Sequence, residues 1–304
     1  MTAIRPDGFK GVAFPRRHVI QAADIPTLLD MGKAHIFVWD PAVDEVHEEE
    51  AGLAGAKALA GSGITYDTPR EGRYNLTASQ DGLLVIDRPR LRALNQVPDF
   101  TAATCPSFTV VKAGDLVAGV RIIPLVTARE NVARVEALGS GILEVRPLLP
   151  RKVGCIITGS EVYEGRIPDR FEPVLREKVA AYKGEMLGVT KCPDDTTAII
   201  KAADTFLRAG AELLLFTGGM SVDPDDLTPA AIRQTGAEII AQGVPVQPGN
   251  MLMLAYLEEI PLIGVLGAAM HHRVTSLDLI LPRIFAGMRI SRDDLLSLGE
   301  GGLL

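Results

Sequence analysis

The chain has 304 residues, of which 47% are hydrophobic and 23% are charged, values typical of a folded globular protein and not of a disordered one. Its length allows two domains of ordinary size, each with its own core. The net charge of −7 argues against nucleic acid as a partner, because surfaces that bind nucleic acid need clustered lysine and arginine. The longest apolar run, residues 260–270, is well short of the roughly 20 residues of a membrane span, so we expect no membrane partner.

The cysteines and the first residues bear on the compartment. Cys105, Cys155 and Cys192 fit neither a disulfide framework nor the spacing of a zinc site. The first residues lack the long apolar stretch of a secretory signal. We therefore expect a reduced, cytoplasmic protein with buried thiols.

The first half of the chain predicts a mixed α and β accessory domain that is rich in strands. Residues 22–31 and 48–60 have helical spacing, whereas the later sequence of this half is rich in strand-forming residues. Two prolines punctuate the chain between residues 146 and 152. We therefore expect one domain at residues 1–148 and a second at residues 149–304.

Two hairpins are predicted inside the β-rich region. Asp81-Gly82 separates residues 75–78 from residues 83–86, and this dipeptide between apolar segments is a strong signal for a tight hairpin. A second turn, at residues 112–115, lies between two further apolar segments and predicts another hairpin.

The second half alternates strands and helices, a pattern typical of a mostly parallel sheet with helices on both faces. The predicted strands are residues 153–158, 186–190, 212–216, 237–240 and 262–266. The predicted helices are residues 168–183, a segment capped by Asp194 or Asp195, a segment from Thr228, and residues 271–285. We therefore expect a doubly wound α/β fold, in which ligands bind at the carboxyl ends of the strands.

One loop of this predicted fold combines glycines with acids. Residues 217–229, Thr-Gly-Gly-Met-Ser-Val-Asp-Pro-Asp-Asp-Leu-Thr-Pro, lie between a buried strand and a helix and are called the TGG loop below. Gly218 and Gly219 let the backbone approach a phosphate closely, and the helix start behind them favours negative charge. Asp225 and Asp226 can hold Mg²⁺ beside ligand phosphates, accept paired N–H donors, or only favour the helix dipole. The loop therefore predicts a phosphate-bearing ligand.

Three further loops bring polar groups to the same predicted edge of the sheet. Residues 158–161 carry a hydroxyl and an acid, residues 248–250 form a Pro-Gly corner followed by an amide donor, and His271 and His272 follow the last strand. Each loop also fits a plain turn. The candidate ligand contacts are Thr158, Gly159, Ser160, Glu161, Thr217, Gly218, Gly219, Ser221, Pro248, Gly249, Asn250 and Gly267.

The order of these loops resembles the molybdopterin-binding domain that molybdopterin adenylyltransferases and molybdopterin molybdotransferases share. The resemblance covers roughly residues 150–290, and its most specific mark is the TGG loop closed by Asp226-Leu227-Thr228-Pro229. It implies a doubly wound α/β fold, molybdopterin (a pterin phosphate) as the ligand, and a role in molybdenum cofactor biosynthesis, storage or insertion. It also implies a homo-oligomer, as a dimer or trimer, and a molybdoenzyme or another cofactor-assembly protein as partner.

The resemblance assigns roles to residues of the loops. It implies that Asp226 is the essential acid, that Asp225 and Asp226 hold Mg²⁺, and that the backbone of Gly218 and Gly219 stabilises phosphate charge. Thr158 and Ser221 would supply hydroxyl contacts, and Asp226 is also the acid that would accept the N–H groups of the pterin edge. Asp225 and Asp226 are thus the predicted catalytic and metal-binding residues.

Several positions depart from the family pattern. Ser160 stands in place of an aspartate, Asp223 in place of a glycine, and Asn250 in place of a lysine. A lysine would have supplied a point charge for phosphate or molybdate. The sequence also ends soon after the α/β half, so that it resembles a truncated, divergent member of the family. These departures favour cofactor binding over turnover as a transferase.

Two alternatives remain open. The acids of the TGG loop also resemble those of a metal-dependent nucleotide pyrophosphatase of the competence-damage-inducible type, where acids hold the metal for attack of water on a pyrophosphate. A non-catalytic ligand sensor would use the same loops without turnover. Bound pterin or metal-dependent hydrolysis would distinguish these readings.

Overall fold

The computed structural model describes residues 2–4, 10–14, 18–36, 44–70, 72–221, 223 and 226–304. It divides into two compact units, Met1–Glu45 and Val46–Leu304. In the first unit, β1 (Thr2–Ile4) pairs antiparallel with β2 (Lys10–Val12). The 3₁₀ helix η1 (Ala22–Asp24) leads directly into α1 (Ile25–Asp30), which confirms the helical segment predicted at residues 22–31.

The described residues from 45 to 146 form three sheets and three helices. The strands are β3 (Glu45–His47), β4 (Ile64–Tyr66), β5 (Tyr74–Ala78), β6 (Gly82–Ile86), β7 (Phe100–Thr104), β8 (Val110–Val111), β9 (Leu116–Ile122), β10 (Val126–Ala128) and β11 (Leu143–Arg146). The helices are α2 (Glu48–Leu59), α3 (Arg88–Asn95) and α4 (Arg129–Glu136). The first sheet has the strand order β4-β5-β9-β7, the second has the order β11-β6-β8, and the third pairs β3 with β10. The predicted mixed, β-rich half is confirmed.

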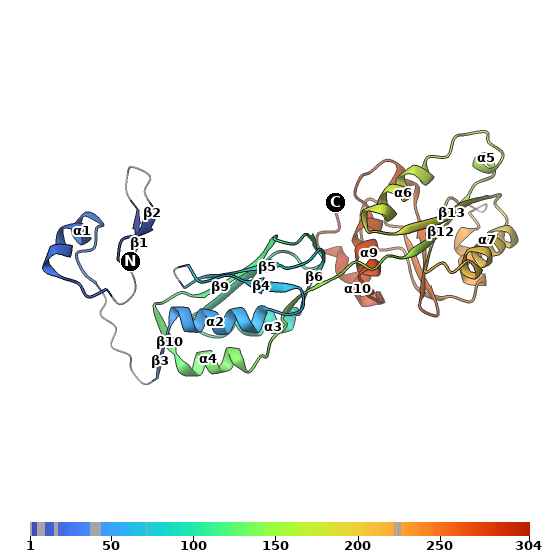
Figure 1. Cartoon of the computed structure of the whole chain (residues 1–304). Coiled ribbons are helices and arrows are strands. Elements are labelled where there is room, and N and C mark those ends of the chain that lie inside the picture. The colour runs from blue at the N-terminus through green and yellow to red at the C-terminus, as the bar shows by residue number, and fades with distance from the viewer. Residues whose placement is uncertain are drawn as a thin grey trace. The chain divides into compact units, whose positions relative to one another are not determined.

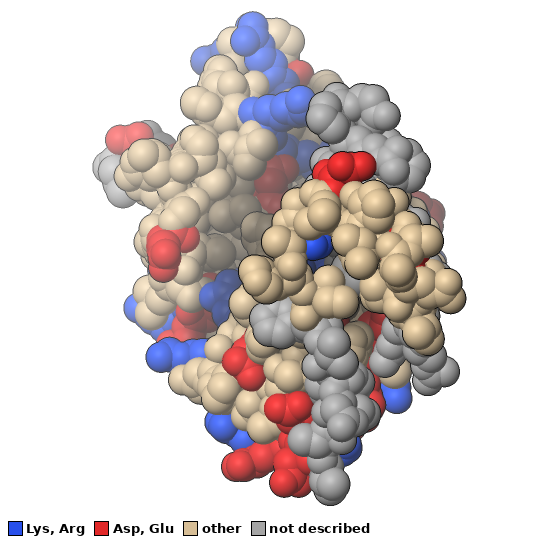
Figure 2. Space-filling model, turned by 90° about the vertical axis from the view of Figure 1, so that its left-hand side faces the viewer, with Lys and Arg blue, Asp and Glu red and all other residues tan. Residues whose placement is uncertain are grey.

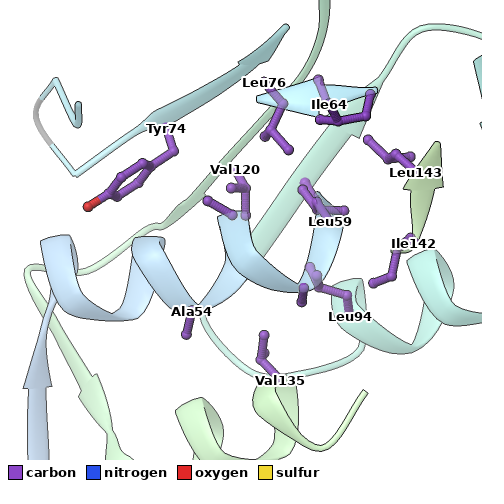
Figure 3. Packing of buried hydrophobic residues seen from close by; sticks show 14 of the residues in the cluster. Ala54, Leu59, Ile64, Tyr74, Leu76, Leu94, Val120, Val135, Ile142 and Leu143 are labelled. Atoms are coloured by element: carbon purple, nitrogen blue, oxygen red, sulfur yellow. The ribbon is translucent and has the colours of Figure 1, made fainter. Parts of the chain in front are cut away.

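Helix α2 lies between the four-stranded sheet and α4, so the three form successive layers (Figure 1). The buried face of α2 consists largely of alanine and glycine, which lets the helix come close to the strands. An added Cβ on Gly55 would lie only 2.7 Å from Cγ2 of Val120. Figure 3 shows Leu59 and Val120 meeting between α2 and the sheet, with Val135 of α4 on the far side of the helix. This core fixes one face of the sheet.

Both hairpin predictions in this region are wrong. β5 and β6 belong to different sheets, and so do β8 and β9. The glycine after Asp81 serves another purpose: an added Cβ on Gly82 would collide with the carbonyl oxygen of Arg146 in the neighbouring strand β11. The close approach of β11 therefore requires glycine at position 82. The Asp-Gly dipeptide marks this approach and not a hairpin between β5 and β6.

The second half forms a six-stranded sheet of order β13-β12-β14-β17-β16-β15. The strands are β12 (Lys152–Thr158), β13 (Glu185–Cys192), β14 (Leu213–Thr217), β15 (Glu238–Gln242), β16 (Met253–Leu257) and β17 (Ile260–Val265). β12, β13, β14 and β17 are parallel, and β16 runs antiparallel to its two neighbours. The doubly wound, mostly parallel sheet is confirmed, although the sequence did not predict β16.

Alternate residues of these strands enter two separate cores. The helices are α5 (Ser160–Tyr163), α6 (Phe171–Ala181), α7 (Thr196–Arg208), α8 (Thr228–Gln234), α9 (Ser276–Phe285) and α10 (Arg292–Leu296), with the 3₁₀ helices η2 (Gly267–Met270) and η3 (Ser297–Gly299). Cys155 and Leu215 join a core with α6 and α9, whereas Ile156 and Leu214 join a core with α7 and α8. Because both faces are covered, these strands are continuous apolar runs.

Two predicted helices begin later than expected because of their caps. α6 begins at Phe171, whose backbone N–H donates to the Asp169 carboxylate at 2.8 Å. α9 begins at Ser276, since Thr275 and Asp278 form a capping box before it. The segment 147–151 between β11 and β12 contains no helix or strand. The domain boundary at residue 148 stays a prediction, and it falls inside the second compact unit.

The surface carries charges of both signs. Figure 2 shows both Lys and Arg side chains and Asp and Glu side chains at the surface of the residues drawn in colour. This distribution agrees with a net charge of −7. Within the described ranges, the structure contains no helix that is long and apolar enough to cross a membrane.

We predict that Gly82→Ala lowers the free energy of unfolding by about 1 to 3 kcal/mol, because the new methyl group overlaps the Arg146 carbonyl. Gly299→Ala is the matched control, since its methyl group would lie 3.7 Å from the Pro245 side chain in ordinary contact. Urea unfolding of both variants measures the difference. Equal stabilities would show that β11 does not depend on the glycine.

Candidate ligand site at the strand ends

The centre of the candidate site is the point where the strand order reverses. From β12 the chain crosses to β13 on one side, and it then returns past β12 to form β14 on the other side. In an open α/β sheet, the crevice at such a switch point is the usual place for a ligand. Thr158, Cys192, Thr217 and Val265 end the four parallel strands at this same edge. The loops after β12, β14 and β17 therefore begin at the same edge, and their contact with a ligand stays a prediction.

The TGG loop touches the end of β12. Gly218 and Gly219 have φ values of +85° and +53°, a region that L side chains rarely adopt. An added Cβ on Gly218 would collide with the carbonyl oxygen of Thr158. Both the backbone conformation and this close approach require glycine. The two loops can therefore touch only because position 218 carries no side chain.

A buried pair of threonine hydroxyls fastens the same contact. The Thr228 hydroxyl donates to the Gly218 carbonyl at 2.8 Å, and its oxygen lies 3.0 Å from Oγ1 of Thr158. Because the carbonyl has no proton, the proton of Thr228 is used there and Thr158 must donate to Thr228. Thr158 is 2% exposed. Its hydroxyl braces the loops, and a direct contact with ligand, in which it can act only as acceptor, stays a prediction.

Met220 holds the TGG loop down on the sheet. It is 4% exposed, and its methyl group lies where a side chain on Gly264 of β17 would be. Met220 was not among the residues predicted to shape the site. The alternation of Gly264 with buried apolar residues in β17 is the signal that could have indicated a covering side chain.

The acidic part of the TGG loop folds back on itself. One carboxylate oxygen of Asp226 accepts the backbone N–H of Asp223 at 3.1 Å, and the Asp226 N–H donates to the Asp223 carbonyl at 3.0 Å. Asp226 is half-buried, whereas Asp223 and Ser221 are exposed. Asp225 lies outside the described residues. Within the described ranges, no group of three or more His, Cys, Asp or Glu side chains is arranged to hold a metal ion.

Ser160 joins the loop after β12 to the loop after β13. Its backbone N–H and its hydroxyl both lie within hydrogen-bond distance of Oδ2 of Asp194, at 2.8 and 3.0 Å. Asp195, and not Asp194, caps α7 by accepting the Ala198 N–H at 2.7 Å. An aspartate at position 160 would place two carboxylates face to face. The departure from the family pattern at Ser160 thus supplies a neutral donor to Asp194.

The Pro-Gly corner packs against the start of α9. The Ser276 N–H donates to the Pro248 carbonyl at 3.1 Å, and the Ser276 hydroxyl donates to the Gly249 carbonyl at 2.6 Å. A side chain on Gly249, whose φ is +103°, would collide with Ser276. The corner is therefore fixed by the fold. Asn250 beside it is exposed and remains a predicted ligand contact.

The remaining predicted contacts lie at the rim of this edge. Glu161 is exposed, and Gly159 has a φ of +129°. Gly267 opens the 3₁₀ helix η2. The two histidines, His271 and His272, are exposed in the turn after η2 and do not begin α9 as expected.

Two of the three thiols, Cys155 and Cys192, are buried. Burial raises the pKa of Cys155 to about 12, and burial also raises the pKa of Cys192 at the end of β13. Both groups are therefore neutral thiols at physiological pH, and a thiol is not the nucleophilic form of cysteine. Cys105 is only half-buried.

Comparison with protein families gives two matches. Residues 154–286 match a family described as "Probable molybdopterin binding domain". Residues 1–40 match a domain of unknown function. The first match covers the described sheet and the loops at its edge.

Two curated proteins illustrate the similarity. A molybdopterin molybdenumtransferase from Synechococcus elongatus is 34% identical over 131 residues, which is 40% of this chain and 32% of that protein. A CinA-like protein from Mycobacterium sp. is 37% identical over 91 residues, 29% of this chain and 21% of that protein. The chain thus spans a third or less of the length of these relatives.

Among solved structures, the chain is similar to a tungsten cofactor synthesizing protein MoaB from Pyrococcus furiosus, with 19% identity and a TM-score of 0.40 over 47% of this chain and 98% of that one. It is also similar to a molybdopterin biosynthesis moea protein from Pyrococcus horikosii. That similarity has 15% identity and a TM-score of 0.37, over 82% of this chain and 75% of that one.

We predict that Gly218→Ala is more destabilising than Gly165→Ala. Both glycines have positive φ, +85° and +73°, but nothing lies within 4 Å of an added Cβ on Gly165. The control therefore measures backbone strain alone, about 1 to 3 kcal/mol, and Gly218→Ala adds the collision with Thr158. Denaturant unfolding would contradict the loop contact if the two losses were equal.

A second prediction concerns the pair of Ser160 and Asp194. Ser160→Asp should lower the free energy of unfolding at neutral pH by between about 1 and 4 kcal/mol, as expected for like charges a few ångström apart. The deficit should shrink as the pH falls toward roughly 4, where aspartate takes up a proton. Adding Asp194→Asn should restore stability. A deficit that persists in the double variant would rule out charge repulsion as its cause.

Proposed function

Because residues 154–286 form a domain of the molybdopterin-binding family, we propose that this chain binds molybdopterin, a pterin phosphate, at the switch point between β12 and β14. The observation that carries the proposal is the fixed contact of the TGG loop with Thr158. It sets a glycine backbone at the ligand edge of a doubly wound sheet, where a phosphate can come close without meeting a side chain.

Different loops would contact different parts of the ligand. Gly218 and Gly219 would lie along the phosphate, and the rim residues of the neighbouring loops would surround the pterin. Asp226 has one carboxylate oxygen engaged with the Asp223 N–H, and the other would accept N–H groups of the pterin edge or bind Mg²⁺. One or two carboxylates together with phosphate oxygens suit Mg²⁺. When bound, the ion would neutralise phosphate charge, with Asp225 as a second proposed ligand.

We propose binding without turnover as the basal activity. Where the family resemblance leads one to expect a lysine, Asn250 offers no charge to an oxyanion. The acid of the TGG loop is partly satisfied by its own backbone, and Ser160 is engaged with Asp194. These contacts favour a preformed binding site over one with spare charged groups for transfer of a metal or nucleotide.

The wider setting follows from the same proposal. The chain would act in the cytoplasm as a dimer or trimer, in assembly, storage or insertion of the molybdenum cofactor. Its protein partner would be a molybdoenzyme or another protein of cofactor assembly. A pterin carrier must release its ligand to such a partner.

A metal-dependent nucleotide pyrophosphatase is the second candidate function. The similarity to CinA-like proteins supports it, with 37% identity over 91 residues. In that case Asp226 and its neighbour would hold the metal that activates water. The two functions differ in their ligand. Only a molybdopterin-binding protein would keep a bound pterin through purification.

The test uses the full chain purified from a host that makes molybdopterin. After oxidation of the bound material, pterin fluorescence should appear at a fixed ratio to protein. Asp226→Asn should weaken pterin binding roughly tenfold or more, about 1.4 kcal/mol, whereas Asp204→Asn on the exposed face of α7 should not. If the Asp226→Asn variant kept full affinity for the pterin, Asp226 would not be part of the site. No pterin, together with metal-dependent hydrolysis of ADP-ribose, would favour the pyrophosphatase.

A further inference from the structure

The four-stranded sheet β4-β5-β9-β7 has two different faces. Tyr74, Leu76 and Val120 are buried on the side of α2 (Figure 3). Successive side chains of a strand point to opposite faces. Asn75, Gly119 and Arg121 alternate with these core residues and therefore lie on the other face, where the strand residues are partly or fully exposed.

This outer face is hollowed. A cavity of about 410 Å³ lies over β9 and β7, and its lining includes Arg73, Arg121, Thr101, Ala103, Gly119 and Cys105. The register explains the hollow, because Gly119 pairs with Ala103 on one side and Asn75 on the other. A glycine beside an alanine leaves a floor with almost no side chain. Cavities of this size are typical of sites for small organic molecules.

Two arginines border the floor on one side. Tyr74 pairs with Val120, so that Arg73 and Arg121, the next positions outward, face each other across β5 and β9. Like charges directly opposite each other in a sheet are destabilising. The Arg73 guanidinium leans over the floor, since an added Cβ on Gly119 would lie 3.2 Å from its Nε. The guanidinium therefore covers Gly119, and the open apolar part of the hollow lies toward Ala103 and Cys105.

The positive charge is only partly compensated by the protein. Arg121 uses its Nε to donate to the Ile122 carbonyl at 3.0 Å, and its Nη2 lies 3.7 Å from the Glu48 carboxylate. Within the described ranges, Arg73 has no carboxylate at ion-pair distance. An anion between the two guanidiniums would relieve their repulsion. Guanidinium groups bind phosphate and carboxylate oxygens in pairs, with good geometry.

We propose that this hollow is a second ligand site, separate from the TGG loop, which binds a small organic anion. The phosphate or carboxylate group of the ligand lies between Arg73 and Arg121, with the Thr101 hydroxyl beside it. The organic body lies beside the Arg73 guanidinium, over Ala103 and toward Cys105, and is no larger than a nucleoside monophosphate. The site makes no use of the pterin domain, so it stands independently of the function proposed above.

Cys105 provides a built-in reporter for this site. It lines the hollow and is half-buried, whereas Cys155 and Cys192 are buried thiols whose pKa values are raised by burial. A thiol reagent applied to the folded chain should therefore react first at Cys105. A ligand in the hollow should slow that reaction. Peptide mapping identifies the labelled residue, so labelling of the other thiols is not confused with it.

The experiment measures the rate of Cys105 labelling in the full chain with three anionic probes: AMP, benzoate and inorganic phosphate. AMP and benzoate distinguish a phosphate from a carboxylate source, and adenosine tests whether the charge is needed. We expect at least one of AMP and benzoate to slow labelling fivefold or more at up to about 10 mM, a concentration that detects even millimolar affinity. If adenosine protected Cys105 as strongly as AMP does, the charge would not be needed and the proposal would be overturned. If inorganic phosphate protected it as strongly as AMP and benzoate do, the organic body would not be needed, and this would overturn the proposal too. No protection by any probe would overturn it as well.

Variants test the geometry. Arg73→Gln should weaken binding of the protecting anion roughly tenfold. Gly119→Ala should weaken that binding too, because the added methyl group would displace the Arg73 guanidinium. Arg92→Gln, an exposed arginine of α3, is the matched control and should leave protection unchanged. Circular dichroism checks that each variant is folded. Equal losses in Arg73→Gln and Arg92→Gln would mean that the anion acts through general charge and would refute the site.

Discussion

The candidate site depends on one close approach, that of Gly218 to the carbonyl oxygen of Thr158. Neighbouring parallel strands leave their ends apart, and side chains normally fill the space between the loops that follow. Here the space is closed by backbone, with two threonine hydroxyls beneath it. The two loops therefore meet through their backbones, in a floor with no side chain between them. A phosphate needs such a floor, because its oxygens must come within hydrogen-bond distance of the backbone.

The α/β half could be predicted well because burial dictates its sequence. Strands covered on both faces must be apolar throughout, as in Leu213–Thr217, and the helices between them carry their own periodicity. Helix starts were less predictable, since Asp169 and Thr275 cap α6 and α9 after plausible earlier starts. β16 was missed because its antiparallel turn, at Glu258 with φ +55°, lacks the glycine or asparagine that usually indicates a hairpin.

The β-rich region was harder, for a physical reason. A turn signal such as Asp81-Gly82 indicates that the chain bends, but not which strand lies beside the one that follows. That choice depends on contacts between residues distant in sequence, such as the close approach of Gly82 to the carbonyl oxygen of Arg146. The same holds at the site. The TGG loop could be recognised locally, whereas the bond of Ser160 to Asp194 spans 34 residues and the pair of Thr158 and Thr228 spans 70.

The two sheets also explain where each could bind a ligand. The six-stranded sheet is covered by helices on both faces, so the ends of its strands are the exposed part at which loops can gather polar groups. The four-stranded sheet packs α2 on one face only, and its other face can be hollowed by small residues within the strands themselves. A site of the first kind takes its chemistry from loops, which vary readily. A site of the second kind takes it from strand residues such as Arg121 and Gly119, whose positions are fixed by the hydrogen-bonded register. Rigidity therefore comes from backbone contact between loops in one case and from the ladder itself in the other.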